Sequence, residues 1–97
     1  MGDVVYISGK ITGTTDYLER FDSAERFLRE HGYEVINPAR VMEPISVDMP
    51  YELFMDMSFV MINYCDVIYM LPDWFESNGA RKERRHAMDR GLKVIYA

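Results

Sequence analysis

Short apolar runs alternate along the chain with longer amphipathic segments, a pattern typical of strands separated by helices. Runs rich in β-branched and aromatic residues predict four strands, at residues 3–8, 33–36, 66–71 and 92–96. Apolar positions at helical spacing predict three helices, at residues 17–31, 51–64 and 77–90. The stretch 39–49 contains Pro44 and has no period, so we expect a loop that lines or covers a site.

This order of elements indicates one α/β domain over residues 1–97, a small flavodoxin- or Rossmann-like fold with three layers. Right-handed crossovers through helices make the four-stranded sheet parallel, and we expect the strand order 2-1-3-4. The crevice between the first and third strands is then the switch point at which ligands bind in such sheets.

The predicted helix 51–64 is apolar almost all the way round, from Leu53 to Ile62. A helix with so little polar surface is buried on more than one side, so we expect it to contact both the core and a second copy of the chain. Its methionines and aromatic residues favour this reading over a cofactor site.

Composition narrows the functional classes. The chain of 97 residues is 48% hydrophobic with a net charge of -5, and its basic residues gather in residues 81–97 on an otherwise acidic body. The net negative charge makes binding of duplex nucleic acid unfavourable. The basic segment could instead bind a phosphate or an acidic partner, or form a solvated face. No apolar run is long enough to span a membrane and no signal peptide is visible, so we expect a cytoplasmic protein. The single Cys65 excludes an intramolecular disulfide, and we expect neither a metal nor a cofactor.

Two loops meet at the expected switch point and offer donors to an anion. The first follows the first strand and the second opens the last helix; together their candidate residues are Ser8, Gly9, Lys10, Ile11, Thr12, Gly13, Ser77, Asn78 and Gly79. Free N–H groups at a helix start favour a phosphate, with Lys10 or Arg81 supplying charge. The same residues also satisfy ordinary turn geometry and helix capping. Trp74 either stacks on a base or braces its loop.

Glu83 is the most informative polar residue. It shares a small-residue stripe with Ala80 and Ala87, which should face the sheet and turn the carboxylate inward near the crevice. The alternative is an ion pair with a neighbour such as Arg81 or Arg84.

Several motifs together resemble the DUF4406 family of the nucleoside 2-deoxyribosyltransferase-like superfamily, whose members are common in phage and bacterial genomes. They are Tyr6-Ile7-Ser8-Gly9-x-Ile11-Thr12-Gly13, Gly32-Tyr33-Glu34-Val35-Ile36-Asn37-Pro38, Cys65-Asp66, Leu71-Pro72-x-Trp74, Ser77-x-Gly79-Ala80-x-x-Glu83 and Ala87. The match runs over nearly the whole chain in order.

The resemblance implies N-glycosidic chemistry on nucleosides or nucleotides in a dimeric α/β fold. It makes Glu83 the nucleophile at the anomeric carbon, Tyr6 its neighbour, and Ser77 a phosphate ligand. It also implies an acid in the second helix eight residues before Asp66, where this chain has Ser58. Lys10 stands where the family usually has proline.

Three hypotheses follow. The first is an N-glycosidase or deoxyribosyltransferase; the second is a silent nucleotide binder, such as a phage protein that sequesters a nucleotide signal, which accommodates Ser58 and Lys10. The third is an oligomeric interaction module that binds a partner through helix 51–64.

Overall fold

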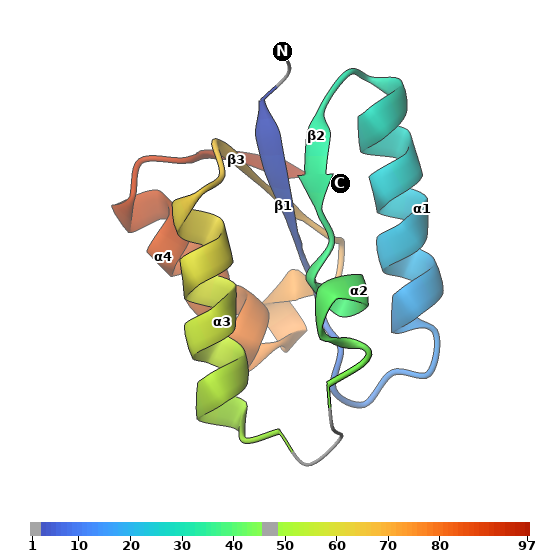
Figure 1. Ribbon diagram of the computed structural model, residues 1–97, viewed down its shortest axis with the longest axis vertical. Coiled ribbons are helices and arrows are strands. Elements are labelled where there is room, and N and C mark those ends of the chain that lie inside the picture. The colour runs from blue at the N-terminus through green and yellow to red at the C-terminus, as the bar shows by residue number, and fades with distance from the viewer. Residues whose placement is uncertain (1–2, 46–48) are drawn as a thin grey trace.

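A computed structural model describes residues 3–45 and 49–97. Four parallel strands form one sheet in the order β2-β1-β3-β4, so the predicted order is confirmed (Figure 1). The strands are β1 (Val4–Ser8), β2 (Glu34–Ile36), β3 (Val67–Met70) and β4 (Lys93–Tyr96). All four lie within the predicted runs, which extended one or two residues too far.

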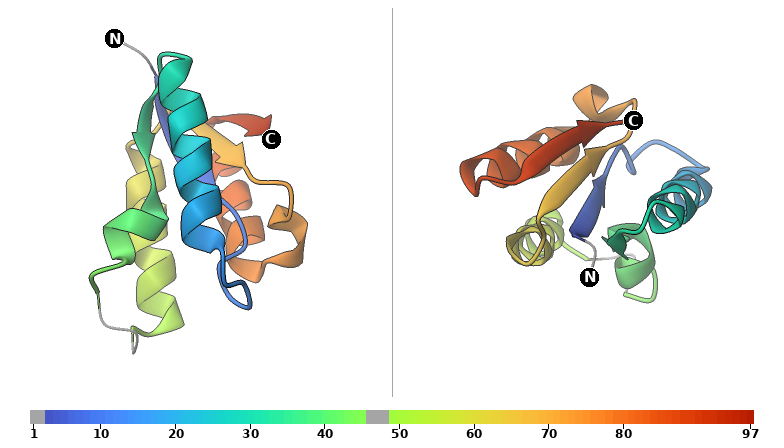
Figure 2. Two further views of the ribbon diagram at one scale, coloured as in Figure 1. Left: turned by 90° about the vertical axis from the view of Figure 1, so that its right-hand side faces the viewer. Right: turned by 90° about the horizontal axis from the view of Figure 1, so that it is seen from above.

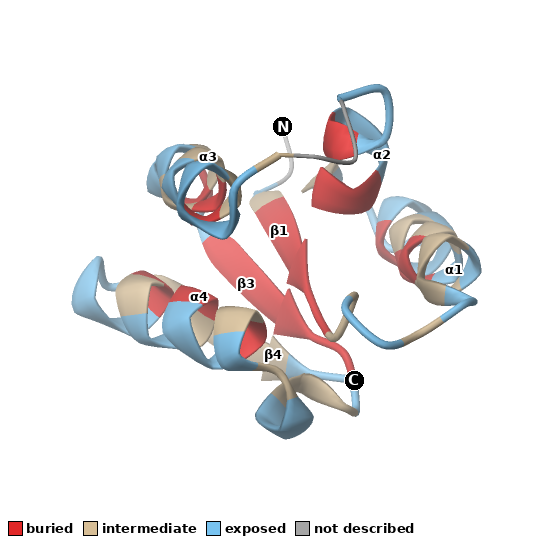
Figure 3. Cartoon of the chain, turned by 90° about the horizontal axis from the view of Figure 1, so that it is seen from below, coloured by how far each residue is buried: buried red, intermediate tan, exposed pale blue. Residues whose placement is uncertain are grey.

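The helices cover both faces of the sheet, as the views in Figure 2 show. They are α1 (Tyr17–Glu30), α2 (Pro38–Met42), α3 (Tyr51–Asn63) and α4 (Asn78–Asp89), with a short 3-10 helix, η1 (Trp74–Glu76), before α4. The core on one face packs α1 and α2 against β1 and β3, and the core on the other face packs α3 and α4. Figure 3 shows β1 and β3 buried between these two layers.

Helix α2 corrects the prediction of a loop at 39–49. Pro38 opens it at the first helical position, where the fixed φ of proline suits a helix and no N–H is needed. Five residues are too short to display a helical period, which is why the pattern did not reveal it. Residues 46–48 of that stretch lie outside the described residues.

Alternation along β1 decides which residues reach each layer. Val5 and Ile7 belong to the core under α1, whereas Tyr6 belongs to the core under α3 and α4. Because side chains alternate across a sheet, Ser8 points to the same face as Tyr6. β1 therefore presents two hydroxyls to the α4 layer, at its carboxyl end.

Cys65 is buried just before β3 and donates to the Met61 carbonyl. Burial, helped by the neighbouring Asp66 carboxylate, raises the pKa of the Cys65 thiol to about 11. Within the described residues, no helix combines the length and apolar character needed to cross a membrane.

Candidate functional site

A buried carboxylate, that of Glu83, lies between α4 and β1. Glu83 is on the face of α4 that also carries the buried Ala80 and Ala87, as its spacing predicted. Its Oε2 accepts a hydrogen bond from the Tyr6 hydroxyl at 2.6 Å, and its Oε1 accepts one from Ser8 Oγ at 2.7 Å. Only 5% of Glu83 is exposed.

Two opposing effects, burial and hydroxyl donors, set the pKa of Glu83. Burial raises the pKa of Glu83 above its ordinary value, and the hydrogen bonds from Tyr6 and Ser8, with the nearby Ser58 hydroxyl, oppose that shift. The alternative of an ion pair with Arg81 or Arg84 is absent, since no ion pair of the described residues includes Glu83. Burial and then the Glu83 charge raise the pKa of Tyr6 well above 10, so the phenol stays a donor.

Ser58 of α3 lies close to both Tyr6 and Glu83. It is completely buried, and its hydroxyl lies near enough to Tyr6 and Glu83 to lower the pKa of both against the larger effect of burial. Among the described residues it has no partner in full hydrogen-bond geometry. Asp56 is exposed on the other side of α3, so no carboxylate of that helix takes the place of Ser58.

Glu83 opens onto a pocket of about 420 Å³ at the carboxyl edge of β1 and β3. This volume lies in the range of about 300–1,000 Å³ that is usual for small-molecule sites. The pocket is lined by the loop after β1, the first turns of α1, α3 and α4, and the α2 segment: Gly9, Ile11, Thr12, Tyr17, Phe21, Pro38, Ala39, Met42, Glu43, Ile45, Met49, Tyr51, Phe54, Ser77, Gly79, Ala80 and Glu83.

Some residues predicted from the sequence meet in this pocket. Gly9, Ile11, Thr12, Ser77, Gly79 and Glu83 line it, and Tyr6, Ser8 and Ser58 are buried around Glu83. Gly9 is required where β1 ends, because a Cβ there would lie 2.7 Å from Leu71 Cδ1. Ser77 Oγ caps α4 by accepting from the Ala80 N–H at 3.1 Å.

The two cations that were expected to supply charge lie elsewhere. Lys10 Nζ pairs with Glu76 at 3.3 Å. Arg81 donates to the Phe75 carbonyl at 2.8 Å and to the Asn78 side chain. Neither side chain lines the pocket, because each finds acceptors in the η1 segment or at the start of α4.

Gly13, Asn78 and Trp74 are also outside the pocket lining. Gly13 takes a positive φ of 82° in the turn after β1, and Asn78 binds Arg81. Trp74 packs against Tyr96 at 5.9 Å between ring centroids, and the Arg84 guanidinium lies 4.8 Å from its ring. The structure thus places Trp74 as a brace of its loop.

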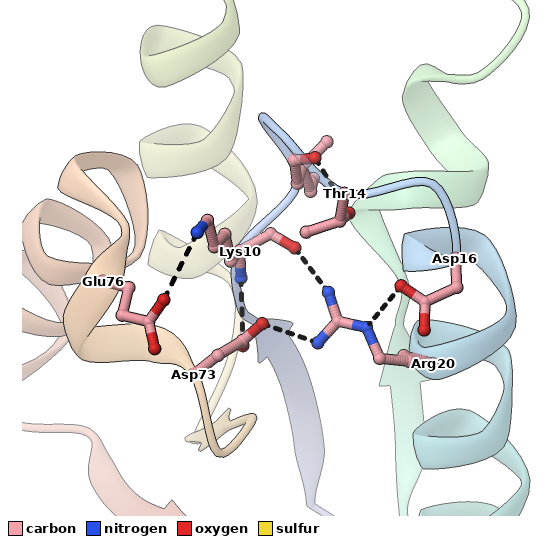
Figure 4. A network of polar contacts seen from close by, with 7 residues as sticks. Lys10, Thr14, Asp16, Arg20, Asp73 and Glu76 are labelled. Atoms are coloured by element: carbon pink, nitrogen blue, oxygen red, sulfur yellow. Dashed lines mark hydrogen bonds and ion pairs between the residues drawn. The ribbon is translucent and has the colours of Figure 1, made fainter.

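A network of polar contacts fixes the loop after β1 relative to the turn after β3 (Figure 4). Arg20 of α1 donates to Asp73 Oδ2 at 2.8 Å and to the Lys10 carbonyl at 2.9 Å, and its Nε pairs with Asp16. The Asp16 carboxylate, at the N-cap position of α1, accepts from Arg20 and does not cap the helix with its side chain. Arg20 therefore holds the loop after β1, which lines the pocket, against the turn after β3.

Sequence reasoning missed the aromatic and α2 parts of the lining. The helical spacing that begins at Tyr17 and Phe21 predicted only packing, and the apolar character of helix 51–64, which contains Tyr51 and Phe54, predicted only core and interface contacts. Their positions in the first turns of α1 and α3 were the available signal, because helix starts gather at the carboxyl edge of a parallel sheet. Within the described residues, no group of three His, Cys, Asp or Glu side chains is arranged to hold a metal ion.

Comparison with known proteins shows the family of the chain and solved structures with a similar fold. The DUF4406 family, described as a domain of unknown function, matches residues 3–96. No curated protein matches the chain. Among solved structures, the CMP N-glycosidase BcmB of Clostridium botulinum is similar with a TM-score of 0.67 and 22% identity, over 96% of this chain and 69% of that one.

Two further structures are similar. The 2-deoxyribosyltransferase of Bacillus psychrosaccharolyticus matches with a TM-score of 0.76 and 18% identity, over 96% of this chain and 70% of that one. The 2-desoxiribosyltransferase of Leishmania mexicana matches with a TM-score of 0.72 and 14% identity, over 97% of this chain and 63% of that one. The chain thus spans about two thirds of the length of these enzymes, and at such identities the likeness concerns the fold. From its match over residues 3–96, the chain belongs to the DUF4406 family, and its fold is that of the nucleoside 2-deoxyribosyltransferase-like proteins.

Proposed function

We propose that this protein cleaves the N-glycosidic bond of a nucleoside or nucleotide, with Glu83 as the nucleophile. The observation that carries the proposal is a buried carboxylate that two hydroxyls hold in one orientation at the wall of a ligand-sized pocket. A carboxylate so fixed is prepared to attack the anomeric carbon of a sugar, because little reorganisation is needed at the moment of reaction.

The hydroxyls of Tyr6 and Ser8 have two roles in this mechanism. Their hydrogen bonds favour the ionised carboxylate against burial, and they hold its oxygens in place while a glycosyl ester forms. Water then resolves the ester in a hydrolase, or a second base resolves it in a transferase. Both reactions share the first step, so the proposal covers both.

The sugar's 5′ end is placed by the start of α4. Ser77 and Gly79 line the pocket one turn before Glu83, where the N–H groups and the positive end of the helix dipole favour an anion. Since Lys10 and Arg81 bind elsewhere, the donors for a 5′-phosphate are hydroxyl and N–H groups alone.

The similar enzymes support this class of chemistry. One is named a CMP N-glycosidase and two are named deoxyribosyltransferases, and both names describe reactions at an N-glycosidic bond. The pocket of this chain and its fixed carboxylate are compatible with such a reaction.

Incubation with a panel of nucleosides and nucleotides, with chromatography of the released base, tests the proposal. We expect release by the parent, loss of release in Glu83→Gln, and retention in Glu30→Gln, which changes an exposed carboxylate at the far end of α1. The amide keeps the size of the side chain and removes only its charge, so the pair isolates the nucleophile.

A nucleotide binder without turnover is the second candidate, and Ser58 favours it, because a buried hydroxyl stands where the resemblance implies an acid. Tight binding by the parent with no base released from any nucleotide would establish the binder and rule out the glycosidase. In that case Glu83→Gln should weaken binding by about 1.5–3 kcal/mol, the range for hydrogen bonds to a charged group.

A further inference from the structure

The pocket is anionic on the charges that line it. Glu83 lies in its wall, and Glu43, paired with Arg40 at 2.9 Å, enters the lining from the end of α2. No Lys, Arg or His is among the described lining residues, and residues 46–48 contain no basic residue either. Among the described residues, Glu83 therefore has no cation partner, whereas Glu43 is paired with Arg40. Because Arg40 also pairs with Asp22, these three side chains together keep a negative charge.

Aromatic side chains make up much of the remaining wall. Tyr17 comes from α1, and Tyr51 and Phe54 come from α3; Phe21 of α1 also borders the pocket but belongs to the core and is only 1% exposed. Aromatic rings attract cations through their electron-rich faces, and the attraction grows when water is excluded. The Tyr51 ring already has Lys82 Nζ at 4.9 Å from its centroid, although Lys82 does not line the pocket.

Among the described residues, Glu83 is the only buried acid, so none of them lies beside it as an acid for the departing base. The nearby Ser58 has a hydroxyl in place of a carboxyl, and Glu43 is held at the pocket mouth by its ion pair with Arg40. A neutral base leaves as an anion unless a group protonates it. A base that is already a cation leaves as a neutral molecule and needs no proton.

Building on the proposed function, we propose that the substrate carries a cationic base, such as an N-glycoside of a pyridinium or an N-alkylated purinium. The C1′–N bond breaks and its electron pair neutralises the base, while Glu83 forms a C1′–O bond. Water then attacks C1′, the Glu83 carboxylate is released, and one proton goes to solvent. Glu43 is a specificity-determining residue, and the aromatic rings of α1 and α3 hold the flat cation.

Two probe pairs that differ mainly in charge test the inference. Nicotinamide riboside and N7-methylguanosine carry cationic rings, and dihydronicotinamide riboside and guanosine are their neutral counterparts. We expect the cationic member of each pair to bind at least about tenfold more tightly than the neutral member, which is the scale of a desolvated cation–π contact. Its kcat/KM for base release should also be higher, because its base leaves as a neutral molecule. Calorimetric titration of each probe measures affinity separately from release.

The variant Glu43→Gln tests the specificity role, with Glu30→Gln as the matched exposed control. We expect Glu43→Gln to raise KM for the cationic probes by about fivefold, the scale of an exposed charge pair, with kcat nearly unchanged. KM for neutral nucleosides should stay the same. A merely structural role for Glu43 would instead alter both kinds of probe alike.

The outcomes separate this inference from the proposed function. Two results together would overturn the cation preference and leave the proposed glycosidase activity intact. They are equal cleavage of cationic and neutral glycosides, and a change in KM in Glu43→Gln that is the same for both. Tighter binding of the cationic probes that weakens in Glu43→Gln, without base release, supports the cation preference and removes the glycosidase. Absence of both binding and release for the cationic probes overturns the inference, and cleavage of neutral nucleosides then decides the proposed function alone.

Discussion

At Glu83, the accompanying hydroxyls set how easily the carboxylate ionises. Burial raises its pKa, and the 2.6 Å hydrogen bond from Tyr6 is the foremost of the contacts that oppose the shift. The spacing in α4 predicted an inward carboxylate, but only the structure showed that both of its oxygens accept from hydroxyls of β1 and that it forms no ion pair with any described residue.

The variant Tyr6→Phe tests this arrangement. Loss of the phenol donor raises the pKa of Glu83 further, so the nucleophile is protonated up to a higher pH. The acid limb of the profile of kcat/KM against pH should move upward by about one unit, because a hydrogen bond to a charged group is worth at least that much. Tyr69→Phe, in the core under α1, is the control; an acid limb that stays put in Tyr6→Phe would contradict the mechanism.

At the scale of elements, Ser77 has two roles, one in the stability of α4 and one in the pocket. Its hydroxyl accepts from the Ala80 N–H and also lines the pocket. Ser77→Ala should lower the free energy of unfolding by about 1 kcal/mol through loss of the cap. It should also reduce the preference for a nucleotide over its nucleoside, as measured by calorimetric titration.

Ser77→Asp separates the two roles of that residue. Aspartate is a good cap and suits the helix dipole, so stability should be kept, while its charge opposes a 5′-phosphate. We expect the preference for nucleotides to disappear in this variant. An unchanged preference in both variants would show that the phosphate is bound elsewhere.

Helix α3 leaves an apolar face in contact with solvent. Only Met55, Ser58 and Ile62 of the helix are buried, whereas Leu53 and Val60, seven residues apart and so on one face, are large exposed residues, and Val60 is 55% exposed. The fold thus covers only part of the apolar surface that the sequence predicted for this helix. We infer that this face contacts a second copy of the chain, because exposed apolar surface is stabilised when a partner removes it from water.

Light scattering tests the association. The parent should form a dimer or larger assembly at micromolar concentration, and Val60→Lys should shift it toward the monomer. Val41→Lys, a change at an exposed apolar residue on α2, should leave the assembly intact. A monomeric parent would contradict the inference.

At the scale of the whole molecule, the buried carboxylate lowers stability at neutral pH. The raised pKa of Glu83 means that the folded state binds its proton more tightly than the unfolded state. Stability from this group is therefore fully present below the ordinary carboxyl pKa and is lost as pH rises through the folded value. The cost is retained because the ionised form is the proposed nucleophile.

Chemical denaturation of Glu83→Gln measures this cost. The amide does not ionise, so the variant should unfold at higher denaturant than the parent at about pH 7, and the difference should shrink toward about pH 4, where the carboxyl is protonated in both states. Glu30→Gln should show no such pH dependence. A parent that is as stable as Glu83→Gln at neutral pH would contradict the raised pKa.

The sequence by itself determined the sheet and the inward glutamate. The β-branched and aromatic run of β1 and the helical spacing in α4 depend on residues only a few positions apart, so both can be recognised along the chain. The parallel order 2-1-3-4 followed from the alternation of strands and helices. The edge of the sheet at which Ser8, Gly9 and Ser77 meet followed from that order.

Only the tertiary structure decided what surrounds that edge. Lys10 and Arg81 carry charge in the right segments, yet their partners Glu76 and Phe75 came within reach only after the chain folded. Helix α2 was too short to display a period, and its place beside the pocket depends on packing against α1 and β1. The anionic, aromatic character of the pocket is a property of residues that lie far apart in the sequence, because burial and contact are set by the fold and not by neighbours along the chain.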